Sequence, residues 1–434
     1  MNQRDTLKVN ESGKLEIGGI SCNELREQFG TPLYVMDTEY IEKMCDVYSN
    51  TLKNEYGDGM IAYASKAFSC KAIYRIINKA NIGADAVSGG EIYTANASGF
   101  PMEKIIFHGN NKSLSELKLA LDKKVGFVVI DSYIEADILN ELCQNKNHIQ
   151  NVLIRVNPGV EAHTHHFIQT AKVDSKFGFS IDSGEAESIV KYVKSKSNLN
   201  LVGLHCHIGS QIFENKSFSL AVEKMTDFYK KLKCEFGFEF DVLNLGGGFG
   251  IYYAGDDAKK SVNDYADYIK NIAKTLIDCV NKKDIKKPYL ILEPGRSIVG
   301  EAGITLYTVG TVKTIKDVKN YIAIDGGMFD NPRFALYQAK YTVVAADKMN
   351  EKATTCYSVA GKCCESGDII AEDCMLPPII EGDLIAVLST GAYNYSMSSN
   401  YNRNLIPPVV MVKNGKAEYA VKPQTYEDLI RNDV

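Results

Sequence analysis

The stretch MIAYASKAFSCKAIYRIINKANIGADAVSGGEIYTANASGFPMEKIIFHG, residues 60–109, holds the pattern that decides the fold. Short apolar runs at 60–67, 81–88 and 104–109 alternate in it with longer segments of helical period. Such alternation is the signature of repeated strand–helix units and a parallel sheet. The stretch therefore predicts an α/β arrangement that begins near residue 60.

The same alternation continues far beyond residue 109. Five more apolar runs bring the total to eight, and they lie at 126–132, 151–158, 201–209, 241–248 and 289–295. The segments between them include 188–196, 219–233 and 264–282, where apolar residues recur at spacings of three and four, as on one helix face. Eight such units predict a (β/α)8 TIM-like barrel. An open doubly wound sheet is the competing prediction.

After about residue 295 the period changes to strand-like runs separated by turns. These runs lie at 321–327, 341–347, 354–361, 383–393 and 409–421. They predict a C-terminal β-sandwich-like domain. The N-terminal segment 7–19 has hairpin character, so we expect it to join that domain. A chain of 434 residues exceeds the size of one core, and we predict a barrel domain over 36–290 and a β domain of 1–35 with 291–434.

The composition is that of an ordinary soluble protein. Hydrophobic residues make up 45% and charged residues 24%, and the net charge of -5 argues against nucleic-acid partners and favours small molecules. We find no signal-peptide core at the N-terminus and no apolar run long enough for a membrane span. The eleven cysteines are scattered without a C-x-x-C pair, so most should be reduced thiols. We therefore expect a cytoplasmic protein.

Unusual residues gather at the predicted carboxyl ends of the strands, where barrel enzymes build their sites. They are Lys66, Ser88–Glu91, His108–Asn110, Arg155, His205–Ser210, Gly246–Gly248 and Glu293–Arg296. One barrel mouth is thus expected to hold a lysine, two glycine-rich backbone cradles, an acid and a histidine.

This inventory suits pyridoxal 5'-phosphate. Its aldehyde needs a lysine amine for a Schiff base, its phosphate needs backbone N–H donors, and its pyridine nitrogen needs a partner, for which Glu293 is the candidate. The histidines at 205 and 207, with three more at 163–166, could also bind a metal. Because no cysteine or acid with ligand spacing accompanies them, we predict no metal.

Ten motifs carry a family resemblance. They are YASKA (63–67), GADAVSGGE (83–91), HGNNKS (108–113), 156–180, GLHCHIGSQ (203–211), NLGGGFG (244–250), EPGRS (293–297), DGGMFDNPRFALY (325–337), CESGD (364–368) and GAYNYSMSSNYNR (391–403). With them the chain resembles the fold-type III pyridoxal-phosphate decarboxylases, which share the alanine-racemase-like barrel, and within them the diaminopimelate decarboxylases. The resemblance covers nearly the whole chain. It implies decarboxylation of meso-2,6-diaminopimelate to L-lysine and CO2, the last step of lysine biosynthesis.

The resemblance also implies the contacts of the cofactor. It assigns the covalent link to Lys66, with Asp85 and Glu91 in support. It places His207 against the ring and Glu293 at the pyridine nitrogen. The remaining cofactor contacts that it implies are Ser210, Gly248, Gly295, Arg296 and Tyr393.

For the substrate, the resemblance implies contacts from Arg296, Arg333, Tyr337, Glu365 and Tyr393. A guanidinium suits the distal carboxylate and an acid suits the distal amine, so Arg333 and Glu365 match a diamino acid with two carboxylates. Cys364 is implied as the proton donor, although the adjacent Cys363 leaves open which thiol acts. In this family Cys364 and Glu365 serve the neighbouring subunit, which implies a homodimer.

Three other functions compete with this interpretation. A decarboxylase for ornithine, arginine or carboxynorspermidine is disfavoured by D-N-P-R-x-A-L-Y and C-E-S-G-D, which suit a distal carboxylate. An alanine racemase would have tyrosine where Cys364 lies. A non-catalytic regulatory homologue is disfavoured because Lys66, Glu293 and Cys364 are all retained.

Overall fold

The computed structural model describes residues 4–160, 175–255 and 257–434. The chain forms two compact units. A barrel unit contains residues 43–250 and 260–297, and a β unit contains residues 1–42, 251–259 and 298–434. The histidines predicted at 163–166 lie outside the described residues.

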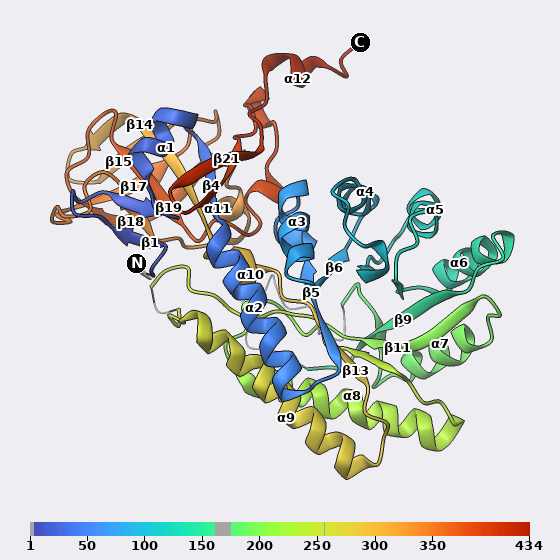
Figure 1. The fold of residues 1–434 in the computed structure, drawn as a ribbon. Coiled ribbons are helices and arrows are strands. Elements are labelled where there is room, and N and C mark those ends of the chain that lie inside the picture. Colours follow the sequence, from blue (N-terminus) through green and yellow to red (C-terminus); the bar gives the residue numbers. More distant parts are fainter. Residues whose placement is uncertain (1–3, 161–174, 256) are drawn as a thin grey trace. The chain divides into compact units, whose positions relative to one another are not determined.

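The barrel unit is built on eight parallel strands that close on themselves (Figure 1). They are β5 (Gly59–Ala64), β6 (Gly83–Ala86), β7 (Ile105–Phe107), β8 (Phe127–Ile130), β9 (Gln150–Asn157), β11 (Leu199–His205), β12 (Val242–Asn244) and β13 (Tyr289–Leu292). The order is β9-β11-β12-β13-β5-β6-β7-β8, and β8 pairs with β9 to complete the ring. A short strand, β10 (Phe179–Ser180), adds to the end of β9. All eight predicted strands are confirmed, and closure excludes the open doubly wound sheet.

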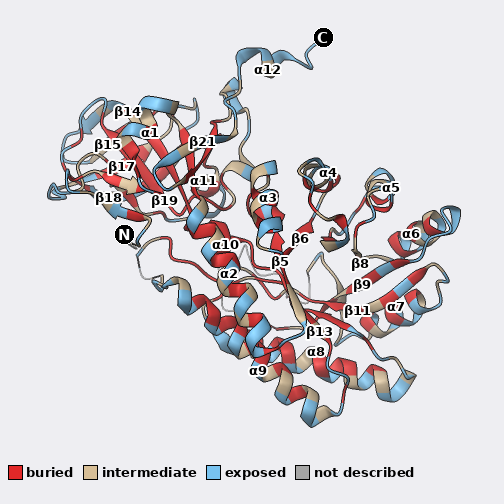
Figure 2. Ribbon diagram, in the orientation of Figure 1, coloured by how far each residue is buried: buried red, intermediate tan, exposed pale blue. Residues whose placement is uncertain are grey.

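Helices alternate with the strands of this unit, and the first of them, α2, precedes β5. They are α2 (Thr38–Glu55), α3 (Lys71–Lys79), α4 (Gly89–Ala97), α5 (Leu114–Asp122), α6 (Tyr133–Asn145), α7 (Glu185–Lys194), α8 (Asn215–Phe236) and α9 (Ala266–Lys283), with short 3₁₀ turns η1 (Ser65–Ala67), η2 (Met102–Lys104) and η3 (Val262–Tyr265). The helices predicted at 188–196, 219–233 and 264–282 are confirmed as α7, α8 and α9. Figure 2 shows the strands mostly buried and the helices buried on one side, as amphipathic periods require.

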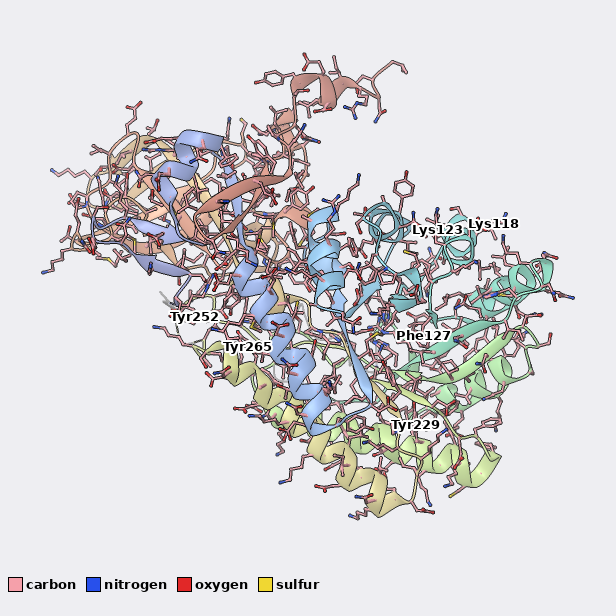
Figure 3. All side chains as sticks on the ribbon, viewed as in Figure 1. Lys118, Lys123, Phe127, Tyr229, Tyr252 and Tyr265 are labelled. Carbon is pink, nitrogen blue, oxygen red and sulfur yellow. The ribbon has the colours of Figure 1, made fainter. Side chains whose placement is uncertain are left out.

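Two local features fix the ends of the strands. Ser88, Ser113 and Ser132 cap α4, α5 and α6, and each side chain accepts a hydrogen bond from the backbone N–H three residues on. Such caps stabilise a helix start by about 1 kcal/mol. Tyr229 of α8, labelled in Figure 3, reaches two strands, because its hydroxyl accepts from the Leu204 N–H at 3.1 Å and donates to the Val242 carbonyl at 2.5 Å. Tyr229 thus ties α8 to the two strands that lead into the turns of His205–Ser210 and Gly246–Gly248.

The β unit is mostly sheet. Its nine-stranded sheet contains β4 (Leu33–Asp37), β14 (Gly303–Ile315), β15 (Lys319–Ile324), β16 (Val343–Ala345), β17 (Thr355–Ala360), β18 (Ile369–Leu376), β19 (Leu384–Leu388), β20 (Val409–Lys413) and β21 (Lys416–Val421). The main path is β18-β17-β15-β14-β4-β20-β21, while β19 pairs with β14 and β16. The five predicted runs are confirmed as strands, whereas β4, β14 and β18 were not predicted.

The N-terminal strands join this unit, as expected. β1 (Leu7–Val9) and β2 (Leu15–Ile17) form an antiparallel hairpin, and β3 (Ile20–Ser21) completes a small sheet. Leu15 and Ile17 are fully buried in one core with residues of β14 and β19, and β4 pairs with β14 and β20.

Short helices complete the described elements. They are α1 (Cys22–Phe29), α10 (Arg296–Val299), α11 (Arg333–Tyr337) and α12 (Tyr426–Ile430), with η4 (Tyr395–Met397) and η5 (Tyr401–Arg403). Across the described part of the chain, every helix is too short or too polar to cross a membrane.

Candidate active site

Lys66 lies immediately after β5, in the turn η1, and its residue is exposed. Asp85, on the neighbouring strand β6, is buried and accepts a hydrogen bond from the Ser65 N–H at 3.1 Å. Burial raises the pKa of Asp85 to about 7, while the positive charge of Lys66 opposes this rise. The structure therefore places Asp85 where it feels the Lys66 charge, as predicted for a supporting carboxylate.

Glu91 lies in the first turn of α4. Its Oε2 accepts from the Val87 N–H at 2.7 Å, which folds the side chain back over the end of β6. Burial raises the pKa of Glu91 to about 7, and Lys66 again lowers it. Tyr74 links the two segments, because its hydroxyl oxygen lies 2.9 Å from Ser65 Oγ and 3.4 Å from the Glu91 carbonyl oxygen, and its one proton is donated to the nearer Ser65. Lys66, Asp85 and Glu91 thus form one electrostatic group.

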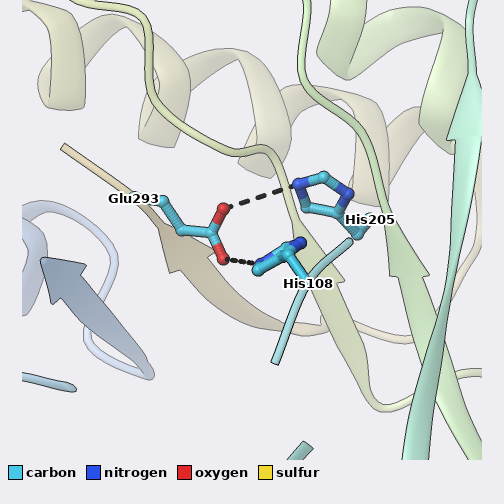
Figure 4. Close-up of side chains that lie close together, drawn as sticks. All are labelled: His108, His205 and Glu293. Atoms are coloured by element: carbon cyan, nitrogen blue, oxygen red, sulfur yellow. Dashed lines mark hydrogen bonds and ion pairs between the residues drawn. The ribbon is translucent and has the colours of Figure 1, made fainter. Parts of the chain in front are cut away.

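Glu293 follows β13 and is buried among three polar side chains from the ends of other strands, two of which, His108 and His205, are drawn in Figure 4. Its Oε1 lies 2.8 Å from His108 Nε2 and 2.7 Å from Asn244 Nδ2, and its Oε2 lies 3.5 Å from His205 Nε2. Burial alone would raise the pKa of Glu293, but the interactions with His108 and His205 outweigh it and hold the pKa well below its usual value. Burial lowers the pKa of His108 and brings that of His205 to about 3. The cluster is therefore an ionised carboxylate held by neutral N–H donors.

The sequence showed no acid at ligand spacing from the histidines, and this expectation is wrong for the folded chain. Glu293, which follows β13, lies next to both His108 and His205. Their ligand atoms lie within 4.8 Å of one another, so the spacing alone would also admit a metal ion. However, Oε1 is already an acceptor for two N–H groups, and one of them belongs to the Asn244 amide. This arrangement suits a carboxylate held for a protonated ring nitrogen better than a metal ligand.

His207 lies in the loop beyond His205, where β11 ends, and not on the strand as predicted. Its Nδ1 accepts a long hydrogen bond of 3.4 Å from the Gly247 N–H. Burial and the charge of Lys66 hold the pKa of His207 well below its usual value, so the ring is neutral. A neutral aromatic ring at this place fits the predicted stacking on a cofactor ring.

The predicted phosphate cradle also comes together. Arg296 Nη2 donates to Ser210 Oγ at 2.9 Å. Gly248 has φ +105°, and a Cβ there would meet the Gly209 carbonyl oxygen at 2.3 Å. A Cβ on Gly295 would lie 2.6 Å from the Ala64 Cβ. Only glycine lets these loops approach one another, which leaves backbone and a guanidinium to face an anion. The barrel residues therefore fit pyridoxal phosphate.

The β unit carries a second group of predicted residues. Arg333 is buried, and its guanidinium carbon lies 5.6 Å from the centre of the Tyr337 ring and 5.5 Å from that of Tyr393. Tyr253, which was not predicted, adds a third ring at 5.9 Å. Among the described residues, Arg333 Nε has no hydrogen-bond partner. Tyr393 itself has φ +64°, a strained backbone for a residue with a side chain. An aromatic cage thus holds a buried guanidinium with unused donor capacity.

Cys364 and Glu365 are exposed and lie in the loop before β18. Asp368 anchors this loop, because its carboxylate accepts from the Cys363 N–H at 2.7 Å and from the Met328 N–H at 2.6 Å. A Cβ on Gly361 would lie 2.3 Å from that carboxylate. Asp368 therefore ties the loop of Cys364 to the loop that leads into Arg333.

Sequence reasoning missed three residues that shape these groups, namely Asn244, Tyr253 and Asp368, and it did not predict that His108 binds Glu293. Asn244 and Asp368 lie inside quoted motifs, which was the available signal. Their hydrogen bonds join residues that are far apart in sequence or belong to different loops, which spacing alone does not show.

Comparisons with known proteins agree with this geometry. A family model described as "Pyridoxal-dependent decarboxylase, pyridoxal binding domain" matches residues 41–300, a span that includes every barrel strand. The fold and the cofactor site are therefore those of a pyridoxal-phosphate-dependent decarboxylase.

Full-length relatives narrow the class. The chain is 46% identical over 429 residues to "Diaminopimelate decarboxylase" of Bacillus subtilis (strain 168), covering 99% of this chain and 97% of that protein. It is 44% identical to the protein of the same name from Staphylococcus aureus (strain COL), covering 99% of both. A crystal structure of diaminopimelate decarboxylase from M. jannaschii in co-complex with L-lysine superposes with a TM-score of 0.90 at 36% identity, covering 100% of this chain and 99% of that one. The chain belongs to the diaminopimelate decarboxylase family.

Proposed function

We propose that the protein is a carboxy-lyase that converts meso-2,6-diaminopimelate to L-lysine and CO2, the last step of lysine biosynthesis. The observation that carries the proposal is the ionised, buried Glu293, held at the same end of the barrel as Lys66 and the Ser210–Arg296 pair. The names of the relatives and the lysine in the M. jannaschii crystal structure support it. Equimolar L-lysine and CO2 from meso-diaminopimelate would bear it out. Holoprotein that forms no lysine would refute it.

Pyridoxal phosphate, when bound, supplies an aldehyde for a covalent link to an amine and a ring that accepts the electron pair left by departing CO2. Lys66 binds the cofactor covalently, and the positive charge of that region is balanced by Asp85 and Glu91. Glu293 keeps a proton on the ring nitrogen, and His207 covers the ring. Ser210, Gly248, Gly295 and Arg296 bind the phosphate, with Tyr393 as a further cofactor contact.

The substrate is selected at its distal end. Arg333 binds the distal carboxylate with a guanidinium whose Nε has no hydrogen-bond partner among the described residues, and Glu365 binds the distal amine. The other substrate contacts that we propose are Arg296, Tyr337 and Tyr393.

Cys364 donates the proton that takes the place of the lost carboxylate. Cys363 is the poorer acid, because burial and the nearby Asp368 raise the pKa of its thiol to about 12. Cys364 is exposed, and its N–H donates to Asn402 Oδ1 at 2.9 Å, so the loop fixes its backbone. An exposed thiol and acid on the β unit are what a contribution to a neighbouring subunit requires, and we propose a homodimer with shared sites.

We further propose that the barrel unit, which extends beyond the predicted end at residue 290 to residue 297, acts as the cofactor-binding domain in place of residues 36–290 alone. Eleven free cysteines fit a reducing compartment, which supports a cytoplasmic location.

Shared sites predict complementation between two inactive variants. In a mixed dimer of Lys66→Ala and Cys364→Ala, one of the two sites keeps both native residues. Random mixing makes half of the dimers mixed, so about one quarter of the parental activity should return. The measurement is the rate of CO2 release after the two variants are unfolded and refolded together.

The matched control mixes Lys66→Ala with Glu293→Ala. Both residues belong to one barrel unit, so no mixed dimer has an intact site and activity should stay absent. Stable dimers of Lys66→Ala and Cys364→Ala without activity would mean that each subunit builds its own site.

A further inference from the structure

The two carboxylate oxygens of Glu293 have unequal surroundings. Oε1 has two close N–H neighbours, His108 Nε2 at 2.8 Å and Asn244 Nδ2 at 2.7 Å. Oε2 has the longer contact of 3.5 Å with His205 Nε2 (Figure 4). A carboxylate oxygen with two short hydrogen bonds has little capacity left, so Oε2 is the better acceptor for a further donor.

The direction of these hydrogen bonds can be read from the backbone. Asn244 Oδ1 accepts from the Gly246 N–H at 2.9 Å, so the amide nitrogen of Asn244 must face Glu293. Glu293 accepts that hydrogen bond and, as an ionised group, has no proton to donate to His108. His108 therefore carries its proton on Nε2, and Oε1 is an acceptor in both bonds.

His108 is also held in place. Its residue is 5% exposed, and its ring packs edge to face on His205 with centroids 4.6 Å apart. Burial lowers the pKa of His108 although Glu293 opposes this, and the positive charge of Arg155 lowers it further. Lys66 acts on His108 in the same direction and so favours the neutral ring.

We propose that His108 and Asn244 are positioning residues, which saturate Oε1 of Glu293 and so reserve Oε2 for the ring nitrogen of pyridoxal phosphate. This inference rests on the proposed role of Glu293. Removing the His108 donor loosens the carboxylate, and the proton on the ring nitrogen is held less firmly. The ring then accepts electrons less readily, although Lys66 still binds the cofactor.

The test compares His108→Leu, which removes the donor, with His108→Gln, which keeps an amide N–H. Each is reconstituted with pyridoxal phosphate labelled with nitrogen-15 in the ring. Loss of a hydrogen bond to a charged group lowers kcat of His108→Leu by about 10- to 100-fold. Its ring-nitrogen resonance should move toward the unprotonated position, and cofactor should dissociate faster. In His108→Gln, kcat, the ring-nitrogen resonance and the rate of cofactor dissociation should all return close to the parental values. The exposed His148→Leu, at the opposite end of the barrel strands, should match the parent.

A His108→Leu holoprotein with the parental ring-nitrogen resonance and kcat within about threefold would overturn the inference. If that variant does not fold, His108→Phe replaces it, since a phenyl ring keeps the packing on His205 without a donor. Glu293→Gln separates the two levels of the proposal. If the ring-nitrogen resonance changes in Glu293→Gln but not in His108→Leu, only the positioning role of His108 is refuted. If the resonance changes in neither variant, the assignment of Glu293 to the ring nitrogen is refuted as well.

Discussion

Lys66→Ala will be colourless and inactive. The parent holoprotein should be yellow, with absorbance above about 400 nm, because a covalently bound cofactor is conjugated with the nitrogen of the lysine. Lys66 follows β5 at the mouth of the barrel, and both Asp85 and Glu91 respond to its charge. Without it the cofactor loses its anchor, and decarboxylation should fall below detection. The measurements are the absorbance spectrum and the mass of the protein after borohydride reduction.

The control for this variant is Lys79→Ala. Lys79 is exposed and ends α3, which runs back from the strand ends toward the other side of the barrel. It should keep both colour and activity. If Lys66→Ala still carried a cofactor that borohydride fixes to the chain, another lysine would be the anchor.

Arg333→Ala will lower kcat/KM for meso-diaminopimelate by roughly two to four powers of ten. The reacting end of the substrate binds the cofactor, so the distal carboxylate needs a separate positively charged partner on the protein. Breaking a desolvated ion pair costs on the order of 3–5 kcal/mol, which corresponds to this range. Arg333→Lys should rescue poorly, because an ammonium does not reproduce the two-pronged guanidinium.

The cofactor absorbance should be unchanged in Arg333→Ala, since the substitution leaves the Lys66 anchor and Glu293 intact. Arg431→Ala is the matched control, because Arg431 directly follows α12 and its side chain is 71% exposed. Turnover of meso-diaminopimelate by Arg333→Ala within about threefold of the parent would refute the substrate assignment built on Arg333.

The barrel could be predicted from sequence because its strands are short apolar runs and the helices between them repeat apolar residues at spacings of three and four. β14 was not predicted as a strand, and its burial explains why. Its first half is buried between β4 and β19, but its second half, which pairs with β15, is largely exposed and contains Gly310 and Lys313. β18 escaped because Glu372 and Asp373 interrupt its apolar residues, and Asp373 has φ +54°. Polar, exposed or irregular strands depend on their neighbours, which a single sequence does not display.

The site could be predicted only as a set of residues at strand ends. Lys66, Glu293 and Arg296 were placed at the barrel mouth from order along the chain alone. The partner of Glu293 was not predicted, because His108 lies 185 residues away and directly after a different strand, β7. His205 and His207 are two residues apart, and the sequence does not show which of them faces Glu293. The structure shows that β11 ends at His205, whose ring faces Glu293, while His207 lies in the following loop. Strand ends of this kind are set by closure of the ring of strands.

The central claim is that the protein decarboxylates a diamino acid with a distal carboxylate. The most direct test is the initial rate of CO2 release from meso-diaminopimelate beside ornithine, arginine and lysine, with pyridoxal phosphate present. A site built around Arg333 leaves a buried guanidinium unpaired with the other three, so we expect kcat/KM for meso-diaminopimelate to exceed theirs on the order of 10³-fold or more. Release of CO2 from ornithine, arginine or lysine at an equal or higher kcat/KM would contradict the account.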